Sequence, residues 1–493
     1  MGRVKPFLWL ISGAILAFFS LGDAPLPFCV WVAPPLLLHF ARIRSPLKGL
    51  PAIMIAFAIA TGIADIGVLP FRGTAYAAIV AGIALSASLP YLVDRLIAPR
   101  LPGIPSTLVF PLAWVSVEFV GSRLSPSATW GLSGYTQFAN LPLVQLAATT
   151  GTFGITFLVG WFASVVNWSW DLDFTWNKIR PGVLLYAGIF SLVMLAGSVR
   201  LAIQESPVRV VRAAVVSYPR DMFNPGEATR IRFGRVSSEE REPLREKMMM
   251  LQDWFLEATH REALAGAKII IWPELNFLVF KEDEPAFMER AQRLARENSA
   301  YLLMGMASVT LGADRPLENK AVLVDDSGRV VCSYLKGHRV TGPEETLGKP
   351  GNDRPFVGST SYGRAAVAIC FDMDFPEFIR EAGEQRADLL LVPANDWQEI
   401  KHIHSWMAAF RAVENGATMI RATSTGFSTV VDPYGRTLAV TDHFSPGARI
   451  MVAQVPLART GTVYAQVGDL FSWLCLVGLA LLICLGVIRR RSS

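Results

Sequence analysis

The sequence is poor in the residues that mark disulfide, metal and nucleotide chemistry. Its 493 residues hold five cysteines and six histidines, and an odd, scattered set of cysteines does not build a disulfide framework. His402 and His404 are two apart, so on a helix they would face different directions, and no cysteine pair accompanies them. No G-x-x-x-x-G-K-[ST] loop occurs. We therefore expect no metal ion and no cofactor.

Charge is missing from long stretches of the chain. Hydrophobic residues make up 52% of the sequence and the mean hydropathy is +0.36, which is high for a purely soluble protein. A membrane-spanning helix needs about 20 largely apolar residues. The first two candidates are short and could be tilted or partly re-entrant. The apolar stretches are Phe7–Leu21, Leu26–Ala41, Leu50–Leu69, Thr74–Val93, Ile104–Val120, Leu141–Asn167, Gly182–Ile203 and Leu470–Ile488.

A long segment from about Arg209 to Asp469 has frequent charges and no apolar run of spanning length. We predict a transmembrane domain of about seven helices over residues 1–205, a water-soluble domain over 206–467, and a closing transmembrane helix with a basic tail over 468–493. Arg3 and Lys5 make a basic start, but no small-x-small cleavage site follows, so the first run is expected to be a retained helix. Glu118 lies inside an apolar run, where it serves either helix packing or a nearby site.

Positive charge is unevenly distributed between the two ends of the predicted spans. With the N-terminus inside, the outer loops hold only Arg72 and Arg123. This asymmetry fits the positive-inside rule with eight spans and both termini in the cytoplasm. The net charge of +5 therefore reports topology, and we expect no nucleic-acid partner. The inner flanks hold Arg3, Lys5, Arg42, Arg44, Lys48, Arg95, Arg100, Lys178, Arg180, Arg489, Arg490 and Arg491.

The predicted soluble domain alternates short β-rich runs with helical patterns, which is typical of a layered α/β domain. Two turn signals, Asp325–Gly328 and Asp432–Gly435, each predict a hairpin. Helices are expected at Glu239–Ala265, Pro285–Asn298, Pro376–Glu384 and His404–Asn415. Strands are expected at Val208–Ser217, Ile269–Trp272, Tyr301–Ala307, Ala321–Asp325, Val330–Tyr334, Ala365–Ile369, Leu389–Val392, Thr418–Arg421, Ser428–Val431 and Ile450–Val455.

Three motifs place a reactive side chain at the end of an expected strand. Glu274 follows I-I-I-W-P, Lys336 follows S-Y-L, and Cys370 follows A-V-A-I. Singly, each has an ordinary structural explanation as a cap, a surface charge or a packed thiol. Together their chemistry is complementary, because a thiol needs a base or a nearby cation to become a nucleophile. We predict Cys370 as an acyl-accepting nucleophile, with Glu274 as base and Lys336 beside the developing negative charge. A disulfide between Cys370 and Cys332 remains an alternative in an oxidising compartment.

These segments resemble the nitrilase (carbon-nitrogen hydrolase) superfamily, whose Glu, Lys and Cys occur in this chain order. The P-A-N-D-W and R-A-V-E-N-G-A-T-M-I-R-A-T-S-T-G segments, around Asn395, Glu414 and Arg421, also resemble it. In the N-terminal half, F-P-L-A-W-V-S-V-E-F and W-G-L-S-G-Y-T-Q-F-A-N-L-P-L-V-Q-L-A-A-T-T-G look like the bacterial apolipoprotein N-acyltransferase family. The resemblance implies a polytopic α-helical membrane domain joined to an α/β nitrilase-like αββα sandwich.

The resemblance also implies a reaction in two steps, at the periplasmic face of the bacterial inner membrane. Cys370 would take an acyl chain from a phospholipid as a thioester, and the α-amine of a diacylglyceryl apolipoprotein would then accept it. Lys336 and the backbone N–H after Cys370 would hold the oxyanion. Glu344 matches a second essential acid of the family. Phe371 and Asp372 are predicted as supporting residues.

The chain departs from the family beside each of these residues. After Lys336 it reads H-R-V-T-G-P-E where the family usually has H-L-V-P-F-G-E, and Phe371 and Asp372 stand where the family prefers Tyr and Glu. The stretch from Glu344 to Cys370 is also shorter and lacks an apolar arm. Two alternatives therefore stay open: a membrane-tethered amidase or carbamoylase with the same triad, and a non-enzymatic membrane scaffold.

The charge asymmetry makes a testable prediction about topology. A reporter fused after Arg200 is expected to be active outside the cytoplasm, and one fused after Arg491 should report a cytoplasmic end. Labelling from the cytoplasmic side of a cysteine introduced near Glu240 would contradict the eight-span topology.

Overall fold

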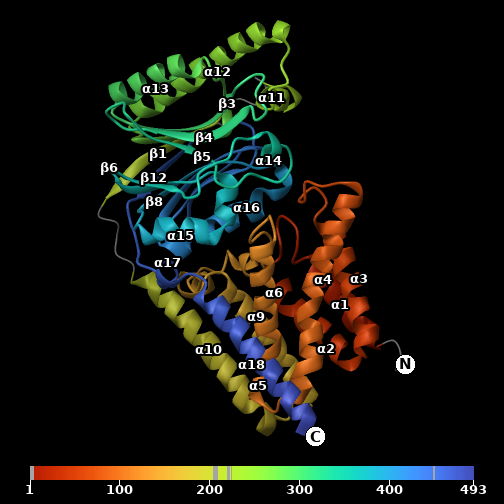
Figure 1. The fold of residues 1–493 in the computed structure, drawn as a ribbon. Helices are drawn as coiled ribbons and strands as arrows, with labels where there is room; N and C mark the ends of the chain where they lie inside the picture. The colour runs from red at the N-terminus through yellow and green to blue at the C-terminus, as the bar shows by residue number, and fades with distance from the viewer. Residues whose placement is uncertain (1–4, 204–208, 219–222, 224, 448–449, 493) are drawn as a thin grey trace. The chain divides into compact units, whose positions relative to one another are not determined.

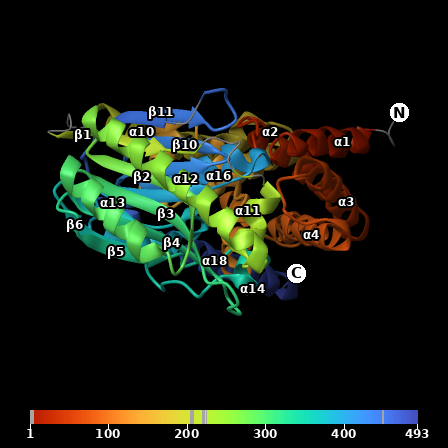
Figure 2. The same cartoon turned by 90° about the horizontal axis from the view of Figure 1, so that it is seen from above.

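The protein forms two compact units in a computed structural model that describes residues 5–203, 209–218, 223, 225–447 and 450–492. One unit comprises Met1–Gln204 with Val467–Ser493, and the other comprises Glu205–Gln466. The first is helical and the second holds both β-sheets (Figures 1 and 2). Arg3, Val208 and the predicted domain boundary at residues 205–206 lie outside the described residues.

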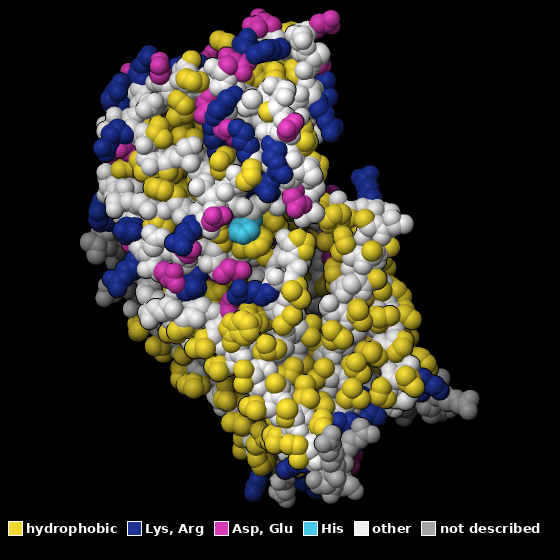
Figure 3. Space-filling view, in the orientation of Figure 1, with side chains coloured by type: hydrophobic (Ala, Val, Ile, Leu, Met, Phe, Trp, Pro, Cys, Tyr) yellow, Lys and Arg dark blue, Asp and Glu magenta, His cyan; other side chains and the backbone are white. Residues whose placement is uncertain are grey.

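The helical unit has six helices that are long and apolar enough to cross a membrane, counted over the described residues: Pro46–Ala64, Gly73–Arg100, Ile104–Leu124, Phe153–Asp171, Trp176–Ala202 and Leu470–Arg489. The first two helices are shorter, as expected, with 14 and 15 residues. On the face seen in Figure 3, apolar side chains cover much of this unit. Its helices are α1 (Lys5–Phe18), α2 (Cys29–Ile43), α3 (Pro46–Ala64), α4 (Gly73–Ile97), α5 (Ile104–Thr107), α6 (Val109–Leu124), α7 (Leu141–Val144), α8 (Ala147–Thr150), α9 (Phe153–Asp171), α10 (Trp176–Ala202) and α18 (Leu470–Ser492).

The predicted continuous span Leu141–Asn167 is wrong at its beginning. Residues 141–150 form two short helices, and α9 begins only at Phe153. Gly151 ends the second short helix with φ of 66°, a left-handed conformation that glycine adopts without a steric cost. The apolar composition of this stretch reflects burial inside the helical unit, so hydropathy alone did not reveal the break.

A cavity of about 620 Å³ lies inside the helical unit, bordered by side chains of α1, α2, α3, α4 and α6. Glu118 of α6 lines it. Its carboxylate accepts hydrogen bonds from Trp114 Nε1 (3.0 Å), Ser133 N and Oγ (3.1 and 2.7 Å) and Thr156 Oγ1 (2.8 Å). These bonds satisfy a buried carboxylate that would otherwise be costly in apolar surroundings.

The second unit contains two six-stranded sheets, ordered β12-β1-β2-β3-β4-β5 and β11-β10-β9-β8-β7-β6. β2 of the first sheet packs against β8 and β9 of the second, with α12 and α13 outside one sheet and α15 and α16 outside the other (Figure 1). The predicted αββα sandwich is confirmed. The strands are β1 (Val210–Val216), β2 (Ile269–Phe280), β3 (Tyr301–Val309), β4 (Leu317–Val324), β5 (Val330–Leu335), β6 (Phe356–Thr360), β7 (Gly363–Val367), β8 (Leu389–Asn395), β9 (Thr418–Ser424), β10 (Phe427–Val431), β11 (Thr437–Asp442) and β12 (Ile450–Pro456). The helices are α11 (Pro225–Arg232), α12 (Ser238–Leu264), α13 (Glu284–Asn298), α14 (Pro343–Leu347), α15 (Pro376–Glu384), α16 (Lys401–Asn415) and α17 (Val463–Val467).

Local sequence explains how the covering helices attach. α12 begins with a capping box, in which Ser237 Oγ accepts from Glu240 N (3.3 Å) and Glu240 Oε2 accepts from Ser237 N (3.0 Å). Its buried side chains recur three or four residues apart, and they join the same apolar cluster as Trp272 of β2. This packing holds β2 rigidly, and β2 carries the first of the predicted reactive residues.

Two strands, β6 and β11, were not predicted. They form the two edges of the second sheet, and most of their side chains are only partly buried. An edge strand has a partner on one side and needs no continuous apolar pattern, so composition did not distinguish these segments from loops. The predicted hairpin at Asp325–Gly328 is confirmed, since it connects β4 to β5. The turn at Asp432–Gly435 also forms a hairpin, but its second strand is β11 and not the predicted strand Ile450–Val455, which pairs with β1.

Candidate active site

Glu274 lies in an interruption of β2. The strand continues to Phe280 instead of ending at Trp272 as predicted, but its pairing with β3 shifts register between Trp272 and Phe277. Gly305 of β3 makes room for the displaced backbone, because a Cβ there would lie 2.3 Å from Pro273 O. The bulge directs Glu274 into the interior, where it is 2% exposed. Bulges of this kind often re-aim a side chain beside an active site.

Lys336 follows β5 directly and is 3% exposed. Its ammonium donates to Glu274 Oε1 (2.8 Å) and to both carboxylate oxygens of Glu344 (3.2 and 3.0 Å). The short loop after α14 closes tightly on this residue, since a Cβ at Gly351 would lie 1.7 Å from Lys336 O. Glu344 is fixed in turn by the backbone N–H of Val340 (3.0 Å). The structure therefore brings all three predicted charged residues into one group, in which Glu274 and Lys336 are buried and Glu344 is partly buried.

Asn319 of β4 belongs to the same group, although the sequence did not single it out. Its Nδ2 donates to Glu274 Oε1 (2.7 Å) and to Glu344 Oε1 (2.6 Å). One amide thus separates two carboxylates that would otherwise repel each other. The only local signal was a polar run, L-E-N-K, within a fully buried strand.

Cys370 stands on a sharp turn after β7, at the start of the 3₁₀ turn Cys370–Asp374. Its φ is 46°, a strained conformation for a residue other than glycine. Leu275 and Thr425 share this feature, with φ of 54° each. The thiol is 4% exposed and lies 3.6 Å from Asn395 O. All five cysteines are free, so the structure excludes the alternative disulfide between Cys370 and Cys332.

Asp372 connects the cysteine turn to the lysine loop. It is fully buried; its Oδ2 accepts from Tyr334 OH (2.7 Å) and Ile369 N (2.9 Å), and its Oδ1 accepts from His338 N (2.7 Å). The turn that holds the thiol and the strand that leads to the ammonium are thereby tied together. Phe371, the other predicted supporting residue, is partly buried, with its ring edge-on to Phe375 at 5.3 Å.

Burial and charge set the protonation of the two reactive groups. Burial alone lowers the pKa of the Lys336 ammonium, but attraction by Glu274 and Glu344 outweighs it and holds the pKa well above 10.5. Burial raises the pKa of the Cys370 thiol well above 9.0, and Glu274 raises it further, against the opposing effect of Lys336. The resting site therefore holds a neutral thiol beside a charged lysine.

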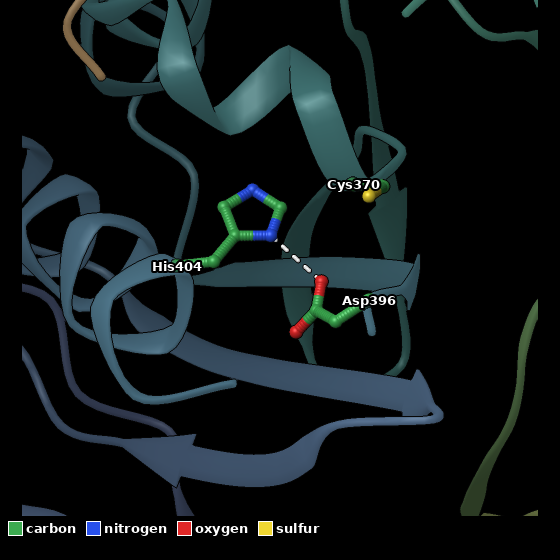
Figure 4. Close-up of side chains that lie close together, drawn as sticks. All are labelled: Cys370, Asp396 and His404. Atoms are coloured by element: carbon green, nitrogen blue, oxygen red, sulfur yellow. Dashed lines mark hydrogen bonds and ion pairs between the residues drawn. The ribbon is translucent and has the colours of Figure 1, made fainter. Parts of the chain in front are cut away.

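A second buried group of charges lies beside the thiol. His404 of α16 contacts Asp396 Oδ1 through Nδ1 (2.7 Å), as Figure 4 shows. Its Nε2 contacts Asp374 Oδ1 (3.1 Å). The Arg421 guanidinium donates to both oxygens of Asp396 (2.8 and 2.9 Å). Burial lowers the pKa of His404, but Asp396 and Asp374 outweigh it and raise the pKa to about 9.

Ligand atoms of Cys370, Asp396 and His404 lie within 4.8 Å of one another, which is close enough to hold a metal ion. Their hydrogen bonds favour a different arrangement. A protonated imidazole has no lone pair for a metal, and both Asp396 oxygens already accept from Arg421. These residues instead form a buried network of two acids and two cations beside the thiol.

His404 generates a prediction about stability and pH. Because its pKa in the folded protein is raised from 6.5 to about 9, the stabilisation is complete below pH 6.5 and is lost as pH rises through 9. A shift of this size corresponds to at most about 3 kcal/mol. We expect the unfolding temperature of the full chain in detergent to fall between pH 7 and 10, and to fall less in His404→Gln. The matched control is His260→Gln, which removes an exposed histidine. An equal fall in all three proteins would contradict the assignment.

Comparisons with known proteins agree with this architecture. Family models match residues 12–165 (apolipoprotein N-acyltransferase N-terminal domain) and residues 235–465 (carbon-nitrogen hydrolase). The apolipoprotein N-acyltransferase of Geobacter metallireducens is 28% identical, over 98% of this chain and 95% of its own. That of Shewanella oneidensis is 24% identical, over 95% and 93%. Among solved structures, an amidase from Nesterenkonia sp. covers 53% of this chain and 95% of its own, with 24% identity and a TM-score of 0.41.

The two matched segments together take in most of the chain, one in the helical unit and one in the sandwich. The two relatives align with this chain across both units, over at least 93% of their own length. Several helices are long and apolar enough to span a bilayer, so this is a multi-pass membrane protein. Over nearly its whole length the chain is similar to apolipoprotein N-acyltransferases, and its second unit is similar to the carbon-nitrogen hydrolase (nitrilase) family.

Proposed function

We propose that this protein transfers a fatty acyl chain from a membrane phospholipid to the N-terminal diacylglyceryl-cysteine of apolipoproteins, through a thioester on Cys370. One observation carries the proposal: a single chain joins an acyltransferase-type helical segment to a sandwich in which Glu274 and Lys336 form a buried ion pair. A hydrolase of small soluble amides would not need the acyltransferase-type helical segment.

In the first step Cys370 attacks the carbonyl carbon of the phospholipid ester. As the Sγ–C bond forms, the thiol proton passes to Glu274, which acts as general base. The ester C–O bond then breaks, and Glu274 returns the proton to the departing glycerol oxygen. The products are an acyl-thioester on Cys370 and a lysophospholipid.

In the second step the free α-amine of the lipoprotein cysteine attacks the thioester. Glu274 takes a proton from the attacking nitrogen, the C–S bond breaks, and the sulfur recovers a proton. An amide has formed and the thiol is regenerated. The neutral resting state of Cys370 suits this cycle, because proton transfer to Glu274 takes place only when an acyl group is in position.

The remaining site residues would stabilise the negative charge of the intermediates or hold the reacting groups in position. Lys336 and the backbone N–H after Cys370 are assigned to the oxyanion of both tetrahedral intermediates. Glu344 and Asn319 hold Lys336 and Glu274 in place through the hydrogen bonds described above. Asp372 would keep the thiol and the ammonium in register, since it bonds to both of their segments.

We place the protein in the bacterial inner membrane with the sandwich on the periplasmic face. The asymmetry of positive charge in the helical unit supports this orientation. Its partners would be the lipid bilayer, a phospholipid donor and a diacylglyceryl apolipoprotein acceptor.

The proposal predicts a covalent intermediate. After incubation of the purified full-length protein with phospholipid vesicles, intact-mass spectrometry should detect one fatty acyl group on Cys370. Cys370→Ser should form no adduct while still folding, because a hydroxyl of similar size ionises far less readily. Cys332→Ser is the matched control and should acylate normally; burial raises the pKa of that thiol to about 12. Absence of an adduct, together with release of ammonia from small amides, would favour the amidase alternative.

The two charged partners of Cys370 should have opposite effects on its thiol. Glu274 raises the pKa of Cys370 and Lys336 lowers it. Alkylation by a small reagent should therefore move to lower pH in Glu274→Gln and to higher pH in Lys336→Met. Both variants should still lose thioester formation, by about 10²–10⁴-fold without the base and about 10²–10³-fold without the oxyanion partner. Thioester formation at the normal rate in Glu274→Gln would show that another group is the base.

A further inference from the structure

Two arginines converge on the end of α14, the short helix that carries Glu344. Arg315 Nη1 donates to Glu345 O (3.1 Å) and Gly348 O (2.8 Å). Arg339 Nη1 donates to the same two oxygens, at 2.8 and 3.1 Å. The two nitrogens cannot lie farther apart than two hydrogen-bond lengths, so two positive charges are held side by side.

Among the described residues, neither Arg315 nor Arg339 makes an ion pair with a carboxylate. A guanidinium has five N–H donors, and only one nitrogen of each is engaged. Arg315 is exposed and Arg339 is partly exposed, so the other donors remain accessible. Capping the last carbonyls of a five-residue helix would require one arginine at most, and a pair of like charges is destabilising unless an anion joins them.

The pair lies within one loop of the reactive group. Arg339 is three residues after Lys336, and the backbone N–H that follows it, at Val340, donates to Glu344. Glu344 in turn holds the Lys336 ammonium. Arg339 is also one of the positions where this chain differs from the motif of its family, because it reads H-R-V where the family usually reads H-L-V. The arginine pair is therefore a feature of this chain beside a shared site.

We propose that Arg315 and Arg339 bind the phosphodiester of the phospholipid acyl donor. The unesterified oxygens of a phosphodiester carry one negative charge and match the planar fork of a guanidinium. In a glycerophospholipid only the glycerol backbone separates this phosphate from the acyl ester that Cys370 would attack. Holding the phosphate would therefore position the ester. The inference rests on the proposed function and specifies its donor as a phosphate-bearing lipid.

The test compares lipids with and without phosphate in neutral detergent micelles. A diether phosphatidylethanolamine can occupy the site but cannot acylate Cys370, so protection of Cys370 from alkylation measures binding alone. We expect Arg315→Gln and Arg339→Gln each to raise the half-protecting concentration about tenfold, as for loss of a charge-assisted hydrogen bond. A diether glycerol without phosphate should protect all proteins equally and weakly. Arg339→Lys, which keeps the charge and one donor group, should be intermediate.

Arg354→Gln is the matched control, because it removes an exposed arginine of the same segment that already faces Glu381 (3.6 Å). It should behave as the unmodified protein. The proposal would be overturned if the diether phosphatidylethanolamine protected the Arg315, Arg339 and Arg354 variants equally. It would also be overturned if protection by inorganic phosphate depended on the two arginines while protection by the diether lipid did not. If the lipid result holds but ester phospholipids form no thioester on Cys370, the transferase proposal fails and the phosphate site stands.

Discussion

The buried ammonium of Lys336, shared between Glu274 and Glu344, is the interaction on which the arrangement of the site depends. Removing one partner from a buried ion pair leaves an uncompensated charge and is strongly destabilising. The protein adds further compensation: Asn319 donates to both acids, and Arg232 of α11 lies near enough to attract both while donating to Leu275 O (2.9 Å). β2, β4, the end of β5 and α14 must therefore keep their relative positions for the charges to be satisfied.

This charge group belongs to one sheet, whereas the thiol belongs to the other. Asp372 connects the two, since it accepts from Ile369 beside the thiol and from Tyr334 of the strand that leads to Lys336. The backbone is strained at Leu275, Cys370 and Thr425. Such strain persists only where the surroundings determine the conformation fully. The packed sandwich provides that rigidity, and it holds together the candidate residues Cys370, Glu274 and Lys336 from distant parts of the chain.

The protonation of Cys370 has a chemical consequence. Burial and the neighbouring Glu274 favour the thiol form, and a thiol is far less reactive toward oxidants than a thiolate. In the orientation and role proposed above, this would protect Cys370 between turnovers. In the nearby network of His404, Asp396, Asp374 and Arg421, Asp396 raises the pKa of Cys370 and Arg421 lowers it, in addition to the effects of burial, Glu274 and Lys336.

The sequence alone predicted the fold class and singled out Glu274, Lys336 and Cys370 as candidate reactive residues. These predictions depend on local features, namely apolar runs, turn signals and the residues on either side of Glu274, Lys336 and Cys370. Such features can be recognised in a short stretch of sequence. The tertiary structure decided what depends on distant contacts. β2 pairs with β3 on both sides of the bulge at Glu274, so the strand is longer than the sequence predicted. Gly151, with its left-handed conformation, separates two helices where the apolar composition had predicted one continuous span. Asn319 lies in the site because β4 pairs with β5. Arg315 lies near Arg339 because both donate to the same carbonyl oxygen just after α14. Hydrogen bonds between residues far apart in the chain leave no periodic pattern in the sequence, because each requires only one suitable side chain at the right point in space.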